Sequence, residues 1–212
     1  MTPWHLPFDE TFRKTFRDLV LWRRDVRRFR TDPVPEKLLD DLIELATHAP
    51  SVGLSQPWRF VKVNSPERRR AVWESFAKAN ERALGGYEGE QKATYTNLKL
   101  AGMKEAPIHL AVFSDESTAT GSGLGRQTMP ETLRYSVVAA VQTMWLGARA
   151  EGLGMGWVSI LDPAEVKNVL DVPPEWTLIG HFCVGYPQDE SDIPTLETDG
   201  WESRAPVTIL KR

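Results

Sequence analysis

Residues 130–160 read PETLRYSVVAAVQTMWLGARAEGLGMGWVSI, and this stretch decides the fold. Residues 130–151 predict a helix whose centre is apolar nearly all round. Such a helix is buried on every side, either in the middle of a domain or inside a subunit interface. The glycine-rich residues 152–156 then turn the chain into a short strand, which we expect over residues 157–160.

The glycines at 152–156 superficially match a dinucleotide-binding fingerprint, but their place in the chain is wrong for one. They follow a helix and precede a strand, whereas the dinucleotide-binding turn follows a strand and opens a helix. Classical dinucleotide binding is therefore excluded. Glycines still permit close approach of the backbone to a flat ligand. Ser159 is expected on the same side of its strand as Trp157, where it would contact such a ligand or bond to the backbone.

Helices and strands alternate irregularly in the rest of the chain. We expect helices at residues 9–22, 35–48, 66–84, 91–104 and 163–170, strands at 58–63, 108–113 and 177–185, and a last strand-like segment at 205–210. More helices than strands in this irregular order are typical of an α+β fold with one central sheet. The length of 212 residues fits one domain, residues 1–212.

The composition excludes several classes of protein. Lys and Arg number 26 against 29 Asp and Glu, so the chain lacks the basic field of a nucleic-acid binder. Its apolar runs are shorter than the roughly 20 residues of a membrane span, and the first residues contain no secretory signal. Cys183 is the single cysteine, and the four histidines lack metal-ligand spacing. We expect a cytoplasmic protein with no metal site and no membrane or nucleic-acid partner.

An arginine cluster follows the first predicted helix at Arg23, Arg24 and Arg27. Guanidinium groups bind phosphate or carboxylate through paired hydrogen bonds, so the cluster can clamp a phosphate, although a solvated charged face has the same pattern. Asp25 lies inside the cluster, where flanking arginines can hold its carboxylate rigidly. It is either a salt-bridge partner of its neighbours or a positioned base.

Two loops carry further polar groups. Residues 50–58, PSVGLSQPW, offer backbone N–H groups, the Ser51 hydroxyl and the Gln56 amide just before a strand. These groups can hold the polar edge of a ring or a ribityl chain, but ordinary connecting loops look similar. Residues 121–126, GSGLGR, lack the Gly-Lys-Ser/Thr of a phosphate-binding loop, so a flexible connection is the simpler interpretation.

Three of these segments stand in a familiar order. They are the R-R-x-x-R cluster at 23–27, P-S-x-x-x-x-Q-P-W at 50–58 and G-x-G-x-G-W at 152–157. Over residues 9–210 the chain resembles the flavin-dependent nitroreductase superfamily.

More specific motifs resemble one subgroup, the 5,6-dimethylbenzimidazole synthases. These motifs are R-R-D-V-R at 23–27, G-W-V-S-I at 156–160, and L-K-L-A-G at 98–102 with a following Ala-Pro. Ordinary nitroreductases usually carry Ser or Thr in place of Asp25. Leu54-Ser55 departs from related chains, which can carry bulkier residues there, and we expect no change of reaction from it.

The resemblance implies a nitroreductase-like α+β homodimer whose central sheet, mixed or antiparallel, is flanked by helices, with FMN at the subunit interface. It implies that the flavin is bound by Arg23, Arg24, Asp25, Val26, Arg27, Ser51, Gln56, Leu100 and Ser159. It further implies that reduced FMN, supplied by a flavin reductase, is the substrate. O2 would fragment it to 5,6-dimethylbenzimidazole, the lower ligand of vitamin B12, and erythrose 4-phosphate.

Two catalytic hypotheses follow from this resemblance. Asp25 removes or directs a proton near ribityl C1′, and Ser159 hydrogen-bonds the flavin near N5 and relays a proton. Residues 75–104 would form a lid that keeps the site dry. The competing interpretations are an NAD(P)H-dependent nitroreductase or flavin reductase, a flavin-binding protein without turnover, and a domain with no ligand.

Overall fold

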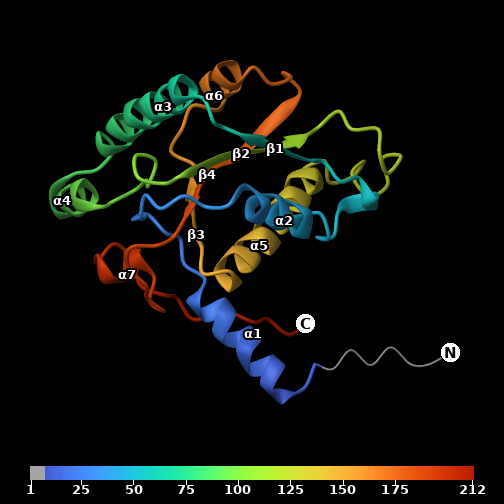
Figure 1. Ribbon diagram of the computed structural model, residues 1–212, viewed down its shortest axis with the longest axis horizontal. Coiled ribbons are helices and arrows are strands. Elements are labelled where there is room, and N and C mark those ends of the chain that lie inside the picture. Colours follow the sequence, from blue (N-terminus) through green and yellow to red (C-terminus); the bar gives the residue numbers. More distant parts are fainter. Residues whose placement is uncertain (1–7) are drawn as a thin grey trace.

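The computed structural model describes residues 8–212, which are built around an antiparallel sheet (Figure 1). Within those residues the sheet has the strands β1 (Trp58–Lys62), β2 (Ile108–Asp115), β3 (Gly154–Val158) and β4 (Trp176–Gly185), in the order β1-β2-β4-β3. Every neighbouring pair is antiparallel. Residues 1–7, where we expect no secretory signal, and His5 among them, lie outside the described part.

Helices connect the strands. They are α1 (Glu10–Trp22), α2 (Glu36–Ala46), α3 (Pro66–Leu84), α4 (Gly89–Asn97), α5 (Thr132–Ala150), α6 (Pro163–Leu170) and α7 (Thr195–Thr198), with a single 3-10 turn at Val52–Leu54. Local chemistry explains several of their starts. The side chains of Asp9, Ser65 and Asp162 accept hydrogen bonds from backbone N–H groups in the first turns of α1, α3 and α6, which leaves fewer of those groups unpaired.

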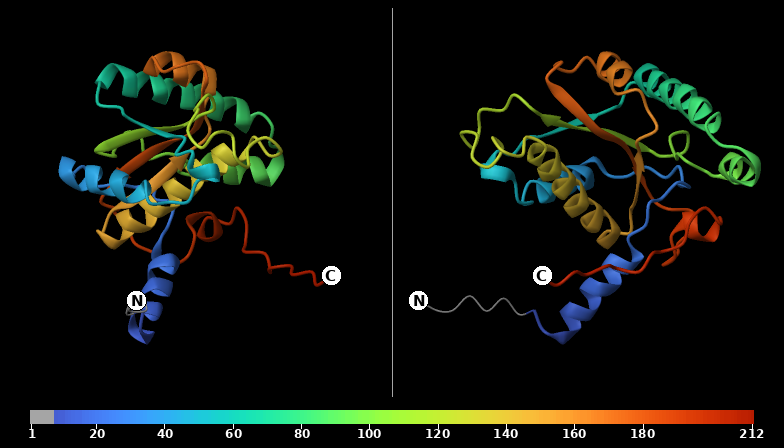
Figure 2. Two further views of the ribbon diagram at one scale, coloured as in Figure 1. Left: turned by 90° about the vertical axis from the view of Figure 1, so that its right-hand side faces the viewer. Right: turned by 180° about the vertical axis from the view of Figure 1, so that it is seen from behind.

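The helices cover both faces of the sheet, α2 and α5 on one and α3 and α6 on the other (Figures 1 and 2). Alternation along the strands separates two apolar cores, because successive side chains point to opposite faces. On β2, Leu110 and Val112 pack with α2 and α5, whereas Ala111 and Phe113 pack on the opposite side. The α+β architecture with a central antiparallel sheet is confirmed.

The central helix α5 is less enclosed than its composition indicated. Its buried side chains face the sheet and α2, but Tyr135 is 57% exposed and Val138 is 37% exposed. Helix α1 projects from the body of the molecule (Figure 1) and has no buried residue. Its Phe12 and Phe16 side chains are 46% and 48% exposed. An exposed apolar stripe of this size is typical of a protein-protein interface.

Three expected elements differ from the structure. The strand expected at 157–160 is β3, Gly154–Val158, because two of the glycines lie within the strand and let another segment pack closely on it. The helix expected at 91–104 ends at Asn97. Residues 205–210 form no strand, since nothing in the described chain pairs with them and Val207 and Ile209 are exposed.

A pair of buried histidines crosses from β2 to β4. His109 Nδ1 lies 2.9 Å from His181 Nε2, and both side chains are almost fully enclosed. Burial, with the positive charge of Arg69 nearby, lowers the pKa of His109 to about 4. Burial, with His109 and Arg69, lowers the pKa of His181 to about 3. The pair is therefore neutral in the folded protein at neutral pH.

This pair predicts a loss of stability in mild acid. Below the ordinary histidine pKa of 6.5, His109 and His181 bind protons in the unfolded chain but stay neutral in the folded chain. The free energy of unfolding therefore falls as the pH drops toward 4. We expect each histidine to lower the free energy of unfolding by about 2 kcal/mol between pH 7 and pH 5. Urea unfolding at both pH values measures this, and replacing both histidines with glutamine should flatten the dependence. An equal loss in that variant would contradict the assignment.

Candidate active site

The site is built where the segment after α1 runs along the edge strand β3. The Val26 N–H donates to the Met155 carbonyl at 2.8 Å, and Asp25 pairs with Met155 as a parallel bridge. Glycine is required on the strand here, because a Cβ at Gly156 would collide with the Val26 carbonyl and one at Gly154 with the Val26 side chain. The glycines of the sequence motif thus bring the arginine cluster onto the sheet.

Asp25 is held by three N–H donors. Its Oδ1 accepts from the Trp157 backbone N–H at 2.8 Å, and its Oδ2 accepts from Arg27 Nε at 3.0 Å and Nη2 at 2.6 Å. A carboxylate has about four acceptor sites, so one remains free. The side chains of Asp25 and Arg27 are 31% and 15% exposed. Asp25 is therefore rigid and still accessible from the adjoining cleft.

Arg23 and Arg24 have capacity to bind an anion. The Nε atom of each is buried and lacks a hydrogen-bond partner within residues 8–212. Burial and the neighbouring guanidinium groups of Arg23 and Arg204 lower the pKa of Arg24. Cations pressed together in this way are stabilised by a negative ligand, and guanidinium groups suit phosphate geometry.

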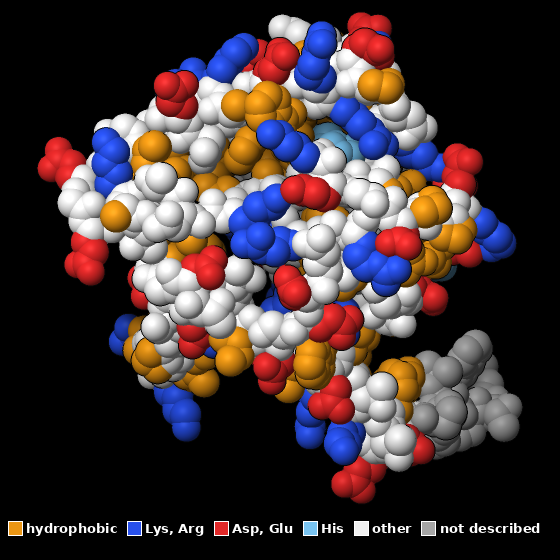
Figure 3. Space-filling model, turned by 60° about the vertical axis from the view of Figure 1, so that its left-hand side comes forward, with side chains coloured by type: hydrophobic (Ala, Val, Ile, Leu, Met, Phe, Trp, Pro, Cys, Tyr) orange, Lys and Arg blue, Asp and Glu red, His pale blue; other side chains and the backbone are white. Residues whose placement is uncertain are grey.

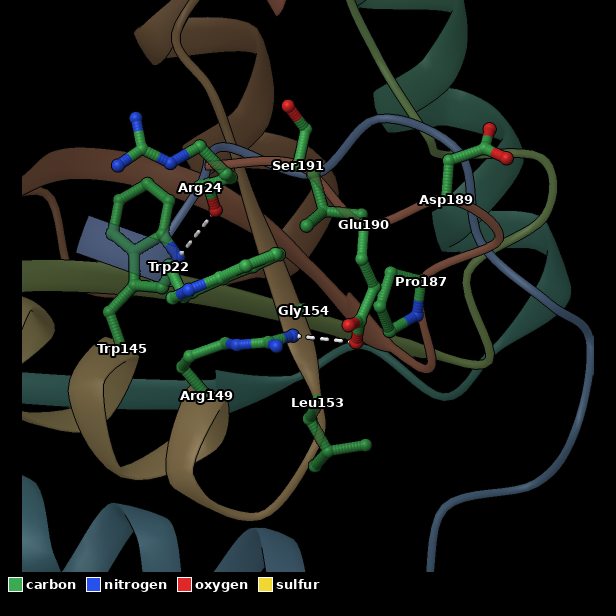
Figure 4. Close-up of a pocket in the computed structure, with 11 residues that line it drawn as sticks. Trp22, Arg24, Trp145, Arg149, Leu153, Gly154, Pro187, Asp189, Glu190 and Ser191 are labelled. Atoms are coloured by element: carbon green, nitrogen blue, oxygen red, sulfur yellow. Dashed lines mark hydrogen bonds and ion pairs between the residues drawn. The ribbon is translucent and has the colours of Figure 1, made fainter. Parts of the chain in front are cut away.

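Aromatic and ionic contacts fix this part of the chain from behind. The Arg23 guanidinium lies 5.1 Å from the centre of the Trp145 ring, and the Trp145 indole N–H donates to the Arg24 carbonyl at 3.2 Å. Figure 4 shows the latter bond and the nearby ion pair of Arg149 with Glu190, at 2.9 Å. The end of α5 thereby positions the arginine backbone.

The arginines border a cleft with two adjoining hollows of about 310 and 200 Å³. Volumes of this order are usual for small-molecule sites. Figure 3 shows Lys and Arg side chains gathered around a hollow on this face. The far wall is the C-terminal segment, which contributes Thr195, Leu196 and Arg204. Sequence reasoning missed Arg204, because it lies about 180 residues from the cluster in a stretch with no motif.

The segment after α4 closes one end of the cleft. Arg27 Nη1 donates to the Lys99 carbonyl at 3.3 Å, and the Lys99 ammonium pairs with Glu105 at 2.6 Å. Leu100 follows and is half-buried. Leu100, which the resemblance implies as a flavin ligand, follows the cleft residue Lys99 in the chain but does not itself line the cleft.

Comparisons with known proteins agree with this geometry. Residues 20–186 match the model of the Nitroreductase family. The chain is 51% identical over 205 residues to a 5,6-dimethylbenzimidazole synthase of Rhodospirillum rubrum, covering 97% of each chain. It is 44% identical to a protein of the same name from Rhodobacter capsulatus, covering 97% of this chain and 99% of that one. The chain belongs to the nitroreductase family, among its 5,6-dimethylbenzimidazole synthases.

A solved nitroreductase-like structure has the same fold. An iodotyrosine deiodinase crystallised with FMN and 3-iodo-L-tyrosine superposes with a TM-score of 0.71 at 25% identity, covering 93% of this chain and 97% of that one. That structure and this chain therefore share the arrangement of the sheet and the helices.

Ser51 and Gln56, expected as flavin ligands, do not line the cleft. Ser51 Oγ accepts from the Gln56 N–H at 3.1 Å, and the Val52 N–H donates to Ser136 on α5 at 3.0 Å. Ser136 and Trp145, which contacts the arginines, are about 14 Å apart along α5 at 1.5 Å per residue. Within one chain the 51–56 loop and the arginine cleft therefore lie toward opposite ends of α5.

Ser159 lies one residue beyond the end of β3, where strand alternation no longer decides which way a side chain points. Its side chain is exposed, and it does not belong to the cleft wall. It nevertheless stands only two residues, about 7 Å, from the Trp157 backbone N–H that holds Asp25.

Within the described residues, no cluster of three His, Cys, Asp or Glu side chains is arranged to hold a metal ion. Among the same residues no helix is both long and apolar enough to span a membrane.

Proposed function

We propose that the protein uses O2 to fragment reduced FMN into 5,6-dimethylbenzimidazole and erythrose 4-phosphate, with the pyrimidine ring of the flavin released as the remaining fragment. Synthases with this product in their name match the chain over 97% of its length, and an FMN-bound relative shares the fold. The observation that carries the proposal is the Asp25 carboxylate, fixed within an arginine cleft and open on one side. We place the reaction in the cytoplasm, with a separate reductase supplying reduced FMN.

The arginine cleft fits the phosphate end of FMN. The guanidinium groups of Arg23 and Arg24, which border the cleft, supply donors for phosphate oxygens, and Arg204 adds positive charge from the opposite wall. Arg27 already bonds to Asp25 and the Lys99 carbonyl, so its role is to brace the carboxylate. Reduced FMN, when bound, supplies electrons to O2 and the carbon atoms of the product.

A second copy of the chain completes the site. The 51–56 loop and the cleft lie toward opposite ends of α5, and the exposed face of Tyr135 and Val138 runs between them. Pairing two copies across this face would set the loop of one beside the cleft of the other. The proposed homodimer thus brings Ser51 and Gln56 to the flavin and also covers the apolar surface of α1.

Asp25 is the proposed catalytic base, and neighbouring residues position it and exclude water. Asp25, with one acceptor site left, takes a proton from ribityl C1′, and Arg27 keeps the carboxylate in place for that transfer. Residues 75–104, which include α4 and the Lys99 contact, act as a lid that excludes water. Val26 supports the cleft through its backbone bond to β3.

The proposal is tested by mixing the protein with photoreduced FMN under nitrogen and then admitting air. Chromatography should show one 5,6-dimethylbenzimidazole for each FMN lost. Intact flavin with oxidation of added NADH would instead establish a nitroreductase or flavin reductase. Tight retention of intact flavin without either reaction would establish a flavin-binding protein.

Ser159 provides a separate prediction. If its hydroxyl relays a proton near flavin N5, Ser159→Ala should slow product formation by roughly 10²-fold, with little change in FMN affinity. Rates are measured in the same aerobic assay, and Ser203→Ala, at an exposed serine outside the cleft wall, is the control. An unchanged rate in the Ser159 variant would remove it from the mechanism.

A further inference from the structure

Three aromatic rings join the lid to the C-terminal wall of the cleft. Tyr87 lies in the turn between α3 and α4, Tyr95 on α4, and Trp201 just after α7. The ring centres are 4.8 Å apart for Tyr87 and Tyr95, 5.4 Å for Tyr87 and Trp201, and 5.9 Å for Tyr95 and Trp201. Both contacts of Trp201 are edge-on, an arrangement that aromatic pairs favour. We call these three residues the aromatic clasp.

Each end of the clasp is anchored by a hydrogen bond. On the lid side, Tyr95 is buried and its hydroxyl donates to Asn80 Oδ1 on α3 at 2.7 Å. On the C-terminal side, the backbone N–H of Trp201 donates to the Leu196 carbonyl at 2.9 Å. Gly200, with φ of +72°, allows the sharp turn that directs Trp201 back toward α4. The Trp201 ring is therefore placed by a compact turn that includes α7.

The same turn forms the wall of the arginine cleft. Thr195 and Leu196 before Trp201, and Arg204 after it, all border the cleft, whereas the Trp201 ring contacts the lid. Elsewhere a groove of about 290 Å³, bordered by Thr94 and Asp199, separates α4 from the C-terminal segment. Figure 1 shows α7 lying between the lid helix α4 and the start of the C-terminal tail. The clasp is thus a direct contact between the lid helix α4 and the C-terminal turn that borders the cleft.

We propose that Trp201 is a positioning residue that couples occupancy of the phosphate cleft to the position of the lid. Phosphate bound by Arg204 orders the C-terminal turn, and the Trp201 ring then holds α4 against the site. In the reverse direction, a closed lid holds Arg204 at the phosphate. This inference rests on the proposed function only in taking FMN as the ligand that enters the cleft.

The first test measures binding by a double-mutant cycle. Oxidised FMN is titrated into wild type, Trp201→Ala, Arg204→Ala and the double variant, following quenching of flavin fluorescence. We expect Trp201→Ala to weaken binding about tenfold alone and less than twofold when Arg204 is already alanine. Trp201→Phe, which keeps an aromatic edge, should restore most of the affinity. Independent, additive losses would overturn the coupling.

The second test reads the lid directly by hydrogen exchange at the amides of α4. Saturating FMN should slow exchange there in wild type and in Trp201→Phe, but not in Trp201→Ala or Arg204→Ala at equal saturation. Protection of α4 that persists in Trp201→Ala, or that is missing in wild type, would overturn the inference. Circular dichroism of each variant, compared with wild type, serves as the control for folding.

The two proposals fail in different ways. Coupling without any 5,6-dimethylbenzimidazole would leave this inference standing and remove the proposed reaction. Product formation without slower exchange in α4 would support the proposed reaction and overturn the coupling by Trp201.

Discussion

Asp25→Asn will lower the rate of 5,6-dimethylbenzimidazole formation by roughly 10²- to 10⁴-fold, the usual cost of removing a general base. The asparagine oxygen can still accept from the Trp157 N–H. Its amide nitrogen, however, would face the Arg27 donors and has no free lone pair for a proton. FMN affinity should change little, because the proposed phosphate contacts are made by Arg23 and Arg24, which border the cleft.

The measurement is product formed per minute after air is admitted, alongside the dissociation constant of oxidised FMN. Asp32→Asn is the matched control, because Asp32 pairs with Arg30 in an exposed ion pair of the same segment. Normal product yield from Asp25→Asn would take this carboxylate out of the reaction. A large loss of FMN affinity with an unchanged turnover would make Asp25 a ligand brace and not a base.

Val138→Asp will dissociate the proposed homodimer and abolish tight FMN binding. Val138 lies in the middle of the exposed face of α5, so pairing two copies would bury an unpaired carboxylate from each. One such buried charge costs about 3–5 kcal/mol, which corresponds to a loss of association of at least roughly 10²-fold. Because the 51–56 loop then no longer meets the partner's cleft, FMN affinity should fall by a similar factor.

Sedimentation velocity gives the oligomeric state, and flavin fluorescence gives the affinity. Asn168→Asp is the control, since it adds the same charge to an exposed position on α6, across the sheet from α5. A Val138→Asp protein that remains dimeric would move the interface elsewhere. A monomer that binds FMN as tightly as wild type would place the complete site within one chain.

Much of the local structure follows from periodicity. The apolar spacing of residues 130–151 specifies α5, and Asp9 and Pro163 mark where α1 and α6 begin. These signals depend on residues only a few positions apart, so they can be recognised from the sequence without the structure. Glycine misled the strand assignment, because Gly154 and Gly156 are poor strand residues that are needed for the packing of Val26.

The candidate site was only partly readable from the sequence. The arginine cluster and Asp25 stand within five residues, so their common chemistry is visible at once. Arg204 and Trp201 carry no local signal, because each gains its meaning from a segment far away in the chain. The sequence identifies the 51–56 loop as a polar motif. It does not show how far this loop lies from the arginine cluster.

The order of residues alone determined most of the helices and strands and placed the Asp25 carboxylate among three arginines, because these features depend on side-chain chemistry repeated over short distances. Tertiary structure decided which groups meet: Asp25 with the Trp157 amide, Arg204 with the arginine cluster, and Trp201 with the lid. Such meetings depend on how helices pack on the sheet and on which glycines let two backbones touch, and this packing is set by the whole chain at once.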